Sequence, residues 1–205
     1  MMDRLRGFAT RFFTPVADRL LRWGVSPDAV TITGTVVVVL AALLLLPTGH
    51  LLAGSLVITV FVLTDSLDGV MARRAGRSGT WGAFLDSTLD RFADAAIFLG
   101  LTLWFAGRDD AIGDWGLGLA LACLVLGSIV PYARARAEGL GMTAKVGIAE
   151  RADRLVAVLV AVFLVGVGLP AVVLIVVLGL LAVASLITVV QRMATVRAQS
   201  REQGA

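Results

Sequence analysis

Cysteine, histidine and charged residues are all scarce in this sequence. Its 205 residues include one cysteine, Cys123, and one histidine, His50. A single cysteine excludes a disulfide framework within the chain, and the apolar run around Cys123 favours a buried structural thiol over a reactive one. His50 follows the turn-forming run Pro47-Thr48-Gly49, so we expect its side chain to be solvated.

The low charge places the chain among integral membrane proteins. Only 16% of its residues are charged, whereas 58% are hydrophobic. Because a membrane helix needs about 20 largely apolar residues, this length holds several spans but no sizeable soluble domain. We therefore predict a single domain over residues 1–205. The net charge of +3 does not indicate a nucleic-acid partner, because the basic residues occur at the ends of apolar segments.

Six apolar segments predict an all-α integral membrane protein with six transmembrane helices. Ser26 and Pro27 form a good start for the first helix, as its N-cap and its first helical residue. No internal repeat relates the segments to one another. The membrane domain is expected at residues 29–197, with spans at about 29–46, 51–74, 83–105, 115–138, 151–167 and 171–196 and a polar tail beyond them.

Residues 3–23 predict an amphipathic juxtamembrane helix before the first span. They combine five arginines with leucine, phenylalanine and tryptophan, which is typical of a helix lying on an anionic membrane surface. Packing against the rest of the protein is an equally good interpretation, and the two are compatible. A cleavable signal peptide is not indicated, because the basic part is long and no apolar core with a small-residue cleavage site follows it.

The basic residues also predict the orientation of the chain in a bacterial cell membrane. With six spans both termini share one side, and that side holds nearly all of the loop arginines. On the opposite side only Arg108 is basic, and three acids accompany it. The positive-inside rule therefore puts both termini, and the connection between the second and third spans, on the cytoplasmic side.

Carboxylates in the second and third spans are the main functional signal. A charged side chain near the bilayer centre costs roughly 2.5–3.5 kcal/mol, so such residues are functional candidates. The carboxylates of each span lie on one face of the predicted helix. Folding the two helices side by side, antiparallel about the polar turn near residue 77, brings four carboxylates to one depth. The level pairs are Asp68 with Asp86 and Asp65 with Asp90, and the same stripes carry Gly69, Ala72, Arg73, Gly82 and Asp94.

Four carboxylates at one depth predict a site for divalent metal ions. Like charges a few Å apart raise one another's pKa, so the group stays ionised only if a cation joins it. Oxygen-only ligation selects Mg²⁺, Mn²⁺ or Ca²⁺ over zinc, and no histidine or cysteine is near in sequence. Two ions about 3.5–4 Å apart would fit the number of ligands and suit phosphoryl chemistry.

The same residues resemble the signature of the CDP-alcohol phosphatidyltransferase family. The pattern D-x2-D-G-x2-A-R-x8-G-x3-D-x3-D is met without a mismatch from Asp65 to Asp90. Proteins of that family have six membrane helices and use two divalent ions to transfer a phosphatidyl group from a CDP-linked lipid to an alcohol, releasing CMP. The resemblance implies that Asp90 is the general base. It also implies two Mg²⁺ or Mn²⁺ ions held by Asp65, Asp68, Asp86 and Asp90, and a CDP-lipid pocket lined by Asp68, Gly69, Ala72, Arg73 and Gly82.

The start of the first span supplies secondary candidates for the CDP-lipid pocket. In the resembled family, a proline followed by a polar residue and by a threonine one turn on lies near the nucleotide. Pro27, Asp28 and Thr31 match that description. Helix capping alone would also explain these residues, so both interpretations stay open.

Three arginines, Arg134, Arg154 and Arg192, lie about one turn inside the fourth, fifth and sixth spans. The first two are equidistant from residue 144, so closing the loop should bring them level. Their planar guanidinium groups suit phosphate oxygens, which favours a phosphorylated acceptor such as inositol phosphate or glycerol 3-phosphate. The structural alternative is pairing with nearby acids, namely Glu138, Glu150 and Asp153.

The segments around these arginines sharpen the resemblance. PYARARAE and ERADRL look like the corresponding segments of actinobacterial phosphatidylinositol-phosphate synthases. In those enzymes basic residues at the positions of Arg134, Arg154 and Arg192 bind the acceptor phosphate. Arg134 stands where a lysine is common, which keeps the charge but alters the geometry of the fork. The resemblance implies a homodimeric membrane enzyme that transfers the phosphatidyl group of CDP-diacylglycerol to inositol 1-phosphate.

Two other functions remain open from the sequence. A phosphatidylglycerophosphate synthase would perform the same chemistry on glycerol 3-phosphate. A proton or cation transporter would also hold carboxylates and arginines within the membrane, although it would not require the small residues Gly69, Ala72 and Gly82.

Overall fold

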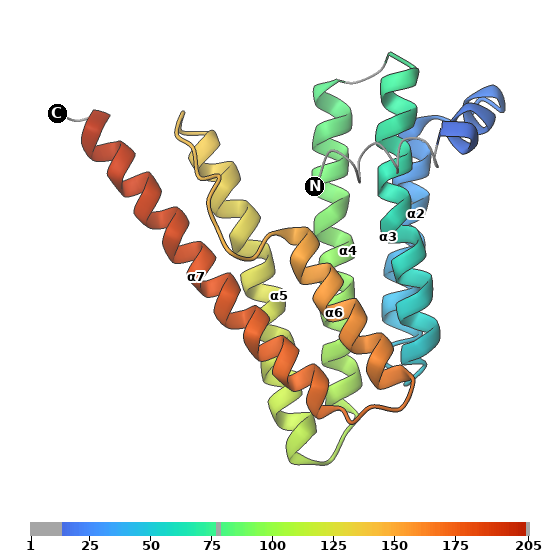
Figure 1. Ribbon diagram of the computed structural model, residues 1–205, viewed down its shortest axis with the longest axis vertical. Coiled ribbons are helices and arrows are strands. Elements are labelled where there is room, and N and C mark those ends of the chain that lie inside the picture. Colours follow the sequence, from blue (N-terminus) through green and yellow to red (C-terminus); the bar gives the residue numbers. More distant parts are fainter. Residues whose placement is uncertain (1–13, 77–78, 204–205) are drawn as a thin grey trace.

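The computed structural model describes residues 14–76 and 79–203, apart from the side chains of residues 64–66, 68 and 203. All regular structure in these residues is helical, as expected. A short helix over residues 14–22 precedes six longer helices (Figure 1). The longer helices are α2 (Pro27–Leu44), α3 (Leu51–Arg74), α4 (Thr80–Ala106), α5 (Ala111–Glu138), α6 (Arg151–Gly166) and α7 (Val172–Gln203).

The predicted segments agree with the observed helices to within a few residues at most boundaries. The start of α2 is capped as expected, because the Ala29 N–H donates to Ser26 Oγ at 3.2 Å and Pro27 occupies the first turn. The exception is the end of α7. A polar tail was expected after residue 196, but the helix continues to Gln203, because the alanine, arginine, glutamine and glutamate there are good helix formers.

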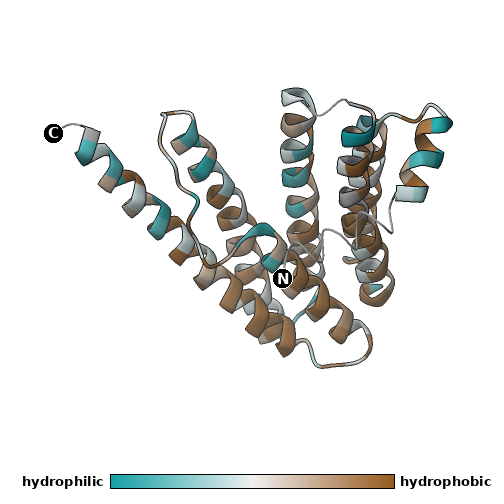
Figure 2. Cartoon of the chain, turned by 45° about the horizontal axis from the view of Figure 1, so that its top comes forward, coloured by the Kyte–Doolittle hydropathy of each residue, from teal (hydrophilic) through white to brown (hydrophobic). Residues whose placement is uncertain are grey.

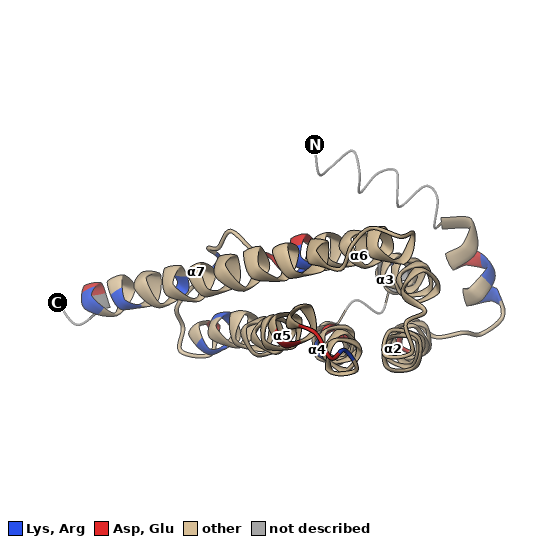
Figure 3. Cartoon of the chain, turned by 90° about the horizontal axis from the view of Figure 1, so that it is seen from below, with Lys and Arg blue, Asp and Glu red and all other residues tan. Residues whose placement is uncertain are grey.

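The six longer helices lie in two layers of three (Figure 3). One layer is α2, α4 and α5 with α4 in the centre, and the other is α3, α6 and α7 with α6 in the centre. Between the layers, α2 packs on α3 and α5 packs on α7. The prediction that α3 and α4 lie directly against each other is therefore wrong: among the described residues their direct packing is slight at most, and α2 contacts both.

Two close helix contacts lie toward the lower end of Figure 1, where the turns at 45–50, 107–110 and 167–171 lie. A Cβ atom on Gly100 of α4 would overlap the Ala42 carbonyl of α2. One on Gly166 of α6 would lie 2.5 Å from the Leu52 nitrogen of α3. Glycine thus allows α4 to approach α2 at backbone distance, which is a physical reason for the observed layer order.

The surface pattern fits a membrane protein. Figure 2 shows hydrophobic residues along most of the helix length and hydrophilic residues gathered at one end of the bundle. In the described part of the chain three helices are long and apolar enough to cross a membrane: α2, α5 and α7. Helix α6 has only 16 residues, and at about 1.5 Å per residue it is shorter than a typical hydrocarbon core.

The short helix at residues 14–22 packs on the C-terminal half of α3. Ala17 is fully buried and clusters with Leu67, Val70 and Met71. Asp18 forms a bidentate pair with Arg74, with Oδ1 2.5 Å from Nε and Oδ2 2.9 Å from Nη2. Packing on the protein is therefore one role of this segment. Residues 3–13 of the predicted juxtamembrane helix lie outside the described residues.

The two rare residues behave as predicted. Cys123 is buried in the core, where its Sγ donates to the Leu178 carbonyl at 3.3 Å. His50 is exposed at the turn after α2, and its Nδ1 lies 3.0 Å from Thr48 Oγ1. Both therefore have structural roles, in the core and in a turn.

Candidate active site

The acidic stripe of α4 runs from solvent into the protein. Asp86 is exposed, Asp90 is partly buried, and Asp94 is buried with 6% of its surface exposed. The three residues are spaced by four, so they share one face of the helix. The predicted stripe on this helix therefore exists, and its deepest carboxylate lies where an unpaired charge would be costly.

The stripe of α3 occupies the face opposite the short N-terminal helix. Leu67, Val70 and Met71 face that helix, which puts Gly69 and Ala72 on the other side of α3. Asp65 and Asp68 lie within α3, but their side chains are outside the described residues. Their role as metal ligands therefore stays a prediction.

Gly69 and Gly82 leave space around the acidic stripes. Among the described residues, a Cβ atom on Gly82 would have no neighbour within 4 Å, and one on Gly69 would approach only Arg73 Nη1, at 3.6 Å. Close helix packing does not explain glycine at these two positions. The other predicted explanation for these two glycines is that they leave room for a ligand.

The start of α2 lies next to the start of α4. Asp28 Oδ2 accepts a hydrogen bond from Trp81 Nε1 at 3.0 Å, and Trp81 directly precedes Gly82. Thr31 is buried, and its Oγ1 donates to the Pro27 carbonyl at 3.2 Å. Pro27, Asp28 and Thr31 thus lie beside a predicted pocket residue, while capping also accounts for Pro27 and local bonding for Thr31.

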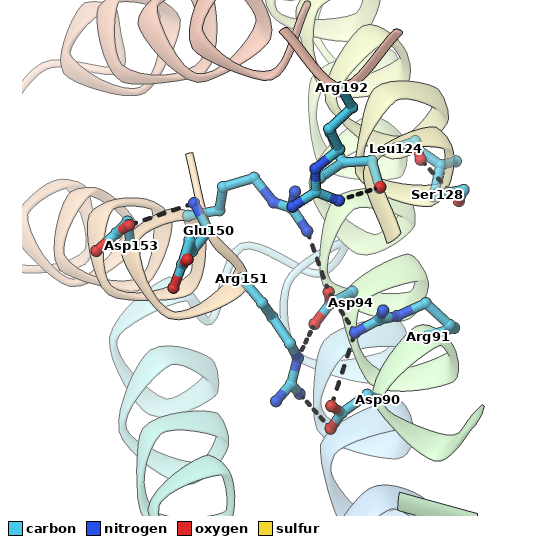
Figure 4. A network of polar contacts seen from close by, with 11 residues as sticks. Asp90, Arg91, Asp94, Leu124, Ser128, Glu150, Arg151, Asp153 and Arg192 are labelled. Carbon is cyan, nitrogen blue, oxygen red and sulfur yellow. Dashed lines mark hydrogen bonds and ion pairs between the residues drawn. The ribbon is translucent and has the colours of Figure 1, made fainter. Parts of the chain in front are cut away.

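Figure 4 shows Arg91 and Arg151 beside the inner carboxylates of α4, and Arg154 is a third arginine close to Asp94. Arg151 contacts both acids, with Nη2 2.8 Å from Asp90 Oδ1 and Nε 3.1 Å from Asp94 Oδ1. Arg91 Nη2 lies 3.6 Å from Asp90 Oδ2 and 3.8 Å from Asp94 Oδ2. Arg154 Nη2 lies 3.6 Å from Asp94 Oδ2. We call these five residues the ion-pair network; it joins α4 to α6 across the two layers.

The connection before α6 explains how Arg151 and Arg154 reach α4. Figure 1 shows that residues 139–150 run back down beside α7 before α6 begins. Thr188 Oγ1 of α7 accepts from the N–H groups of Ile148 and Ala149 at 3.2 and 3.1 Å. This anchor starts α6 partway down the molecule, at the depth of the α4 carboxylates rather than at the end of α5.

The three predicted phosphate-binding arginines occupy different environments. Arg154 and Arg192 are buried, with 3% and 6% of their surfaces exposed, whereas the Arg134 side chain is 46% exposed and pairs with Glu138 at 3.0 Å. Arg192 Nε donates to the Val146 carbonyl at 3.0 Å, and its Nη1 donates to the Val130 carbonyl.

In the described residues the direct packing of α5 on α6 is slight at most, so the two helices are not a simple packed hairpin, and the prediction that Arg134 and Arg154 come level stays a prediction. Arg192 nevertheless lies within electrostatic range of both.

The alternative pairing of these arginines with acids is correct only in part. Glu138 pairs with Arg134, but the Asp153 carboxylate accepts from the Glu150 N–H at 3.3 Å and so caps α6. Asp94, whose role the sequence left open, is the partner of Arg154. Arg151 and Arg91 were missed as site residues. The available signals were spacing alone: Arg151 lies three residues before Arg154, and Arg91 directly follows Asp90.

The chemical type of the described donor atoms, carboxylate oxygen, suits a hard divalent ion. Asp86 and Asp90 supply carboxylate oxygens one turn apart on α4, and such oxygens suit Mg²⁺ or Mn²⁺. Within the described residues no group of three or more histidine, cysteine or acidic side chains is placed to hold an ion. A complete site therefore needs the predicted contribution of α3.

Comparison with known proteins agrees with these features. The family model for CDP-alcohol phosphatidyltransferases matches residues 24–143. The phosphatidylinositol phosphate synthase of Streptomyces avermitilis is 48% identical over 98% of this chain and 84% of its own length. That of Cutibacterium acnes is 48% identical over 96% of this chain and 98% of its own length.

Solved structures extend the similarity to the fold. The Mycobacterium tuberculosis phosphatidylinositol phosphate synthase with CDP-DAG bound has a TM-score of 0.85 and 44% identity, covering 91% of this chain and 94% of that one. The same enzyme in complex with manganese and citrate has a TM-score of 0.84 and 44% identity, covering 90% and 88%. The family model matches more than half of the chain, and the relatives match nearly all of it. The chain therefore belongs to the CDP-alcohol phosphatidyltransferase family.

Proposed function

We propose that this protein transfers the phosphatidyl group of CDP-diacylglycerol to the hydroxyl of inositol 1-phosphate, giving phosphatidylinositol phosphate and CMP. The observation that carries the proposal is the ion-pair network, in which Arg151 and Asp94 connect Asp90 to Arg154. A candidate base and a candidate phosphate-binding arginine thus belong to one cluster. The names of the relatives from Streptomyces and Cutibacterium, phosphatidylinositol phosphate synthases, support the same product.

The proposed reaction is a direct displacement at the phosphorus that carries the lipid. Two Mg²⁺ or Mn²⁺ ions held by Asp65, Asp68, Asp86 and Asp90 would neutralise the diphosphate and polarise that phosphorus. Asp90 accepts the proton of the attacking inositol hydroxyl. The new bond forms between the inositol oxygen and phosphorus, the bond from that phosphorus to the diphosphate bridging oxygen breaks, and CMP leaves.

The remaining predicted residues bind the two substrates. The open space beside Gly69 and Gly82 admits the cytidine diphosphate group, with Ala72, Arg73 and the start of α2 around it. Arg154, Arg192 and Arg134 bind the acceptor phosphate, because guanidinium groups offer paired donors to phosphate oxygens. An acceptor without a phosphate would not need three such residues.

The proposal includes the membrane setting. All six longer helices cross a bacterial cell membrane, with both termini and the site on the cytoplasmic side, as the distribution of arginines favours. The juxtamembrane helix lies on anionic lipid, and the enzyme works as a homodimer.

The decisive experiment measures CMP release from CDP-diacylglycerol by the purified protein with Mg²⁺ or Mn²⁺. Inositol 1-phosphate, glycerol 3-phosphate and unphosphorylated inositol are supplied in turn, and chelation with EDTA is the control. Turnover that requires inositol 1-phosphate and the metal supports the proposal. Preference for glycerol 3-phosphate would make the protein a phosphatidylglycerophosphate synthase, and ion flux in liposomes without CMP release would make it a transporter.

A further inference from the structure

Asp94 is the most highly connected carboxylate in the ion-pair network. Its Oδ1 accepts from Arg151 Nε at 3.1 Å, and its Oδ2 lies 3.6 Å from Arg154 Nη2 and 3.8 Å from Arg91 Nη2. Both oxygens are therefore engaged by guanidinium groups from two helices. Asp94 continues the acidic stripe one turn deeper than Asp90, the last residue of the family signature.

Arg154 depends on Asp94 for its charge balance. Only 3% of its surface is exposed, and Asp94 is its one ion-pair partner in the part of the chain that the structure describes. Its Nη1 is buried and makes no hydrogen bond to any described residue. One side of the guanidinium is thus fixed by Asp94, and the other side keeps a donor for an oxygen atom of a ligand.

The local charge favours an anionic ligand at that donor. The five described residues of the network comprise three guanidinium groups and two carboxylates, so among themselves they carry one positive charge in excess. If Asp94 served only to neutralise Arg154, no unbonded buried donor on Arg154 would be expected among the described residues.

We propose that Asp94 is a positioning residue that aims Arg154 at the phosphate of the acceptor and, through Arg151, ties that arginine to Asp90. The inference rests on the proposed function, because it needs a phosphorylated acceptor and a role for Asp90 in the reaction. Asp94 holds Arg154 by Oδ2 and Arg151 by Oδ1, while Arg151 also holds Asp90. The acceptor phosphate and the acceptor hydroxyl are thereby oriented by one rigid chain of side chains.

The test compares Asp94→Asn and Asp94→Glu with the wild-type protein in the CMP-release assay. Asn removes the charge and weakens the hold on Arg154, so the KM for inositol 1-phosphate should rise about 10- to 100-fold. The KM for CDP-diacylglycerol should stay within about twofold, because the ion-pair partners of Asp94 in the described residues are arginines outside the predicted nucleotide pocket. Glu keeps the charge but displaces it by one methylene, so its acceptor KM should lie between the two.

The matched control is Asp110→Asn. Asp110 also pairs with an arginine, Arg108, at 2.8 Å, but it lies in the turn before α5. Asn keeps its capping ability, so both KM values should remain at wild-type level.

Three results would overturn the inference. They are an unchanged acceptor KM in both Asp94 variants, an equal rise in both KM values, and a loss of kcat with neither KM changed. If the Asn variant does not fold, the Glu variant decides, and a wild-type acceptor KM in a folded Glu variant counts against the role. Failure of the proposed function is distinguished by the wild-type protein, which would then release no CMP with inositol 1-phosphate.

Discussion

At the lower end of the molecule Gly100 and Gly166 bring helices to backbone contact, whereas toward the upper end Gly69 and Gly82 have open space where a side chain would begin. The same residue type therefore serves packing in one region and access in the other. The charged groups divide in the same way. The ion-pair network links α4 to α6 above the packed core, while the large, fully buried side chains Phe98 and Phe105 lie below it on α4.

This contrast teaches how a small membrane enzyme can separate stability from chemistry. Backbone contact at small residues stabilises helix association where no hydrophobic driving force acts between helices. Space and buried charge are costly, and both lie in the region proposed to bind the substrates. Substitutions in the two regions should consequently change different observables.

The largest expected effect is on turnover, from Asp90→Asn. Loss of a general base typically costs about 10²- to 10⁴-fold in rate, so kcat should fall at least about 100-fold while the melting temperature stays near that of wild type. Steady-state CMP release and thermal unfolding in detergent measure the two quantities. Asp109→Asn, an exposed acid near the lower turn, is the control and should change neither. Near-full activity in Asp90→Asn would remove Asp90 from its role.

Arg154→Ala should chiefly affect acceptor binding. Removing a buried guanidinium from a phosphate should raise the KM for inositol 1-phosphate about 10- to 100-fold. Arg108→Ala removes an arginine that pairs with Asp110 at the lower end and should leave that KM unchanged. An acceptor KM at wild-type level in Arg154→Ala would contradict the phosphate pocket.

Gly100→Ala should affect stability rather than catalysis. The added Cβ overlaps the Ala42 carbonyl, and overpacking of this kind costs about 1–3 kcal/mol. The expected result is a lower melting temperature with an unchanged KM for both substrates in the folded fraction. Gly118→Ala is the matched control on α5, because its Cβ would have no neighbour within 4 Å. Equal melting temperatures for the two variants would contradict the idea that close glycine packing stabilises the lower end of the molecule.

Gly82→Leu should have the opposite effect to Gly100→Ala, because it should change substrate binding rather than stability. The side chain enters open space, and leucine is a better helix former than glycine by up to about 1 kcal/mol, so the melting temperature should hold or rise slightly. The KM for CDP-diacylglycerol should rise about 10-fold, because the new side chain occupies the volume that admits the nucleotide. A loss of stability with an unchanged KM would show that Gly82 serves packing after all.

The smallest expected effect is a pH dependence at the lower end. The hydrogen bond from Arg108, with further help from the Gly113 N–H, lowers the pKa of Asp110 below its ordinary value of 3.8. A depressed pKa contributes stability that is present above the ordinary value and is lost as pH falls through the folded value. Asp110→Asn should therefore melt slightly below wild type at pH 6, and the difference should shrink below about pH 4. A constant difference down to pH 3 would contradict the assignment.

Local features of the sequence determined much of this protein. The limits of α3, the Ser26 cap, the buried thiol of Cys123 and the acidic stripe of α4 all follow from hydropathy, helical period and capping chemistry, which act between residues near in sequence. The family signature from Asp65 to Asp90 is likewise a local pattern, and its match identified the family before any contact was known.

Only the tertiary structure decided which helices are neighbours. A helical period states which residues share a face but not which helix that face meets, so the sequence wrongly placed α3 directly against α4, whereas α2 contacts both. The prediction that Arg134 and Arg154 come level assumed a simple hairpin about residue 144, whereas the connection runs down along α7, where Thr188 accepts from the N–H groups of Ile148 and Ala149. The pairing of Asp94 with Arg151 and Arg154 depends on that descent, a non-local contact that no spacing within the sequence encodes.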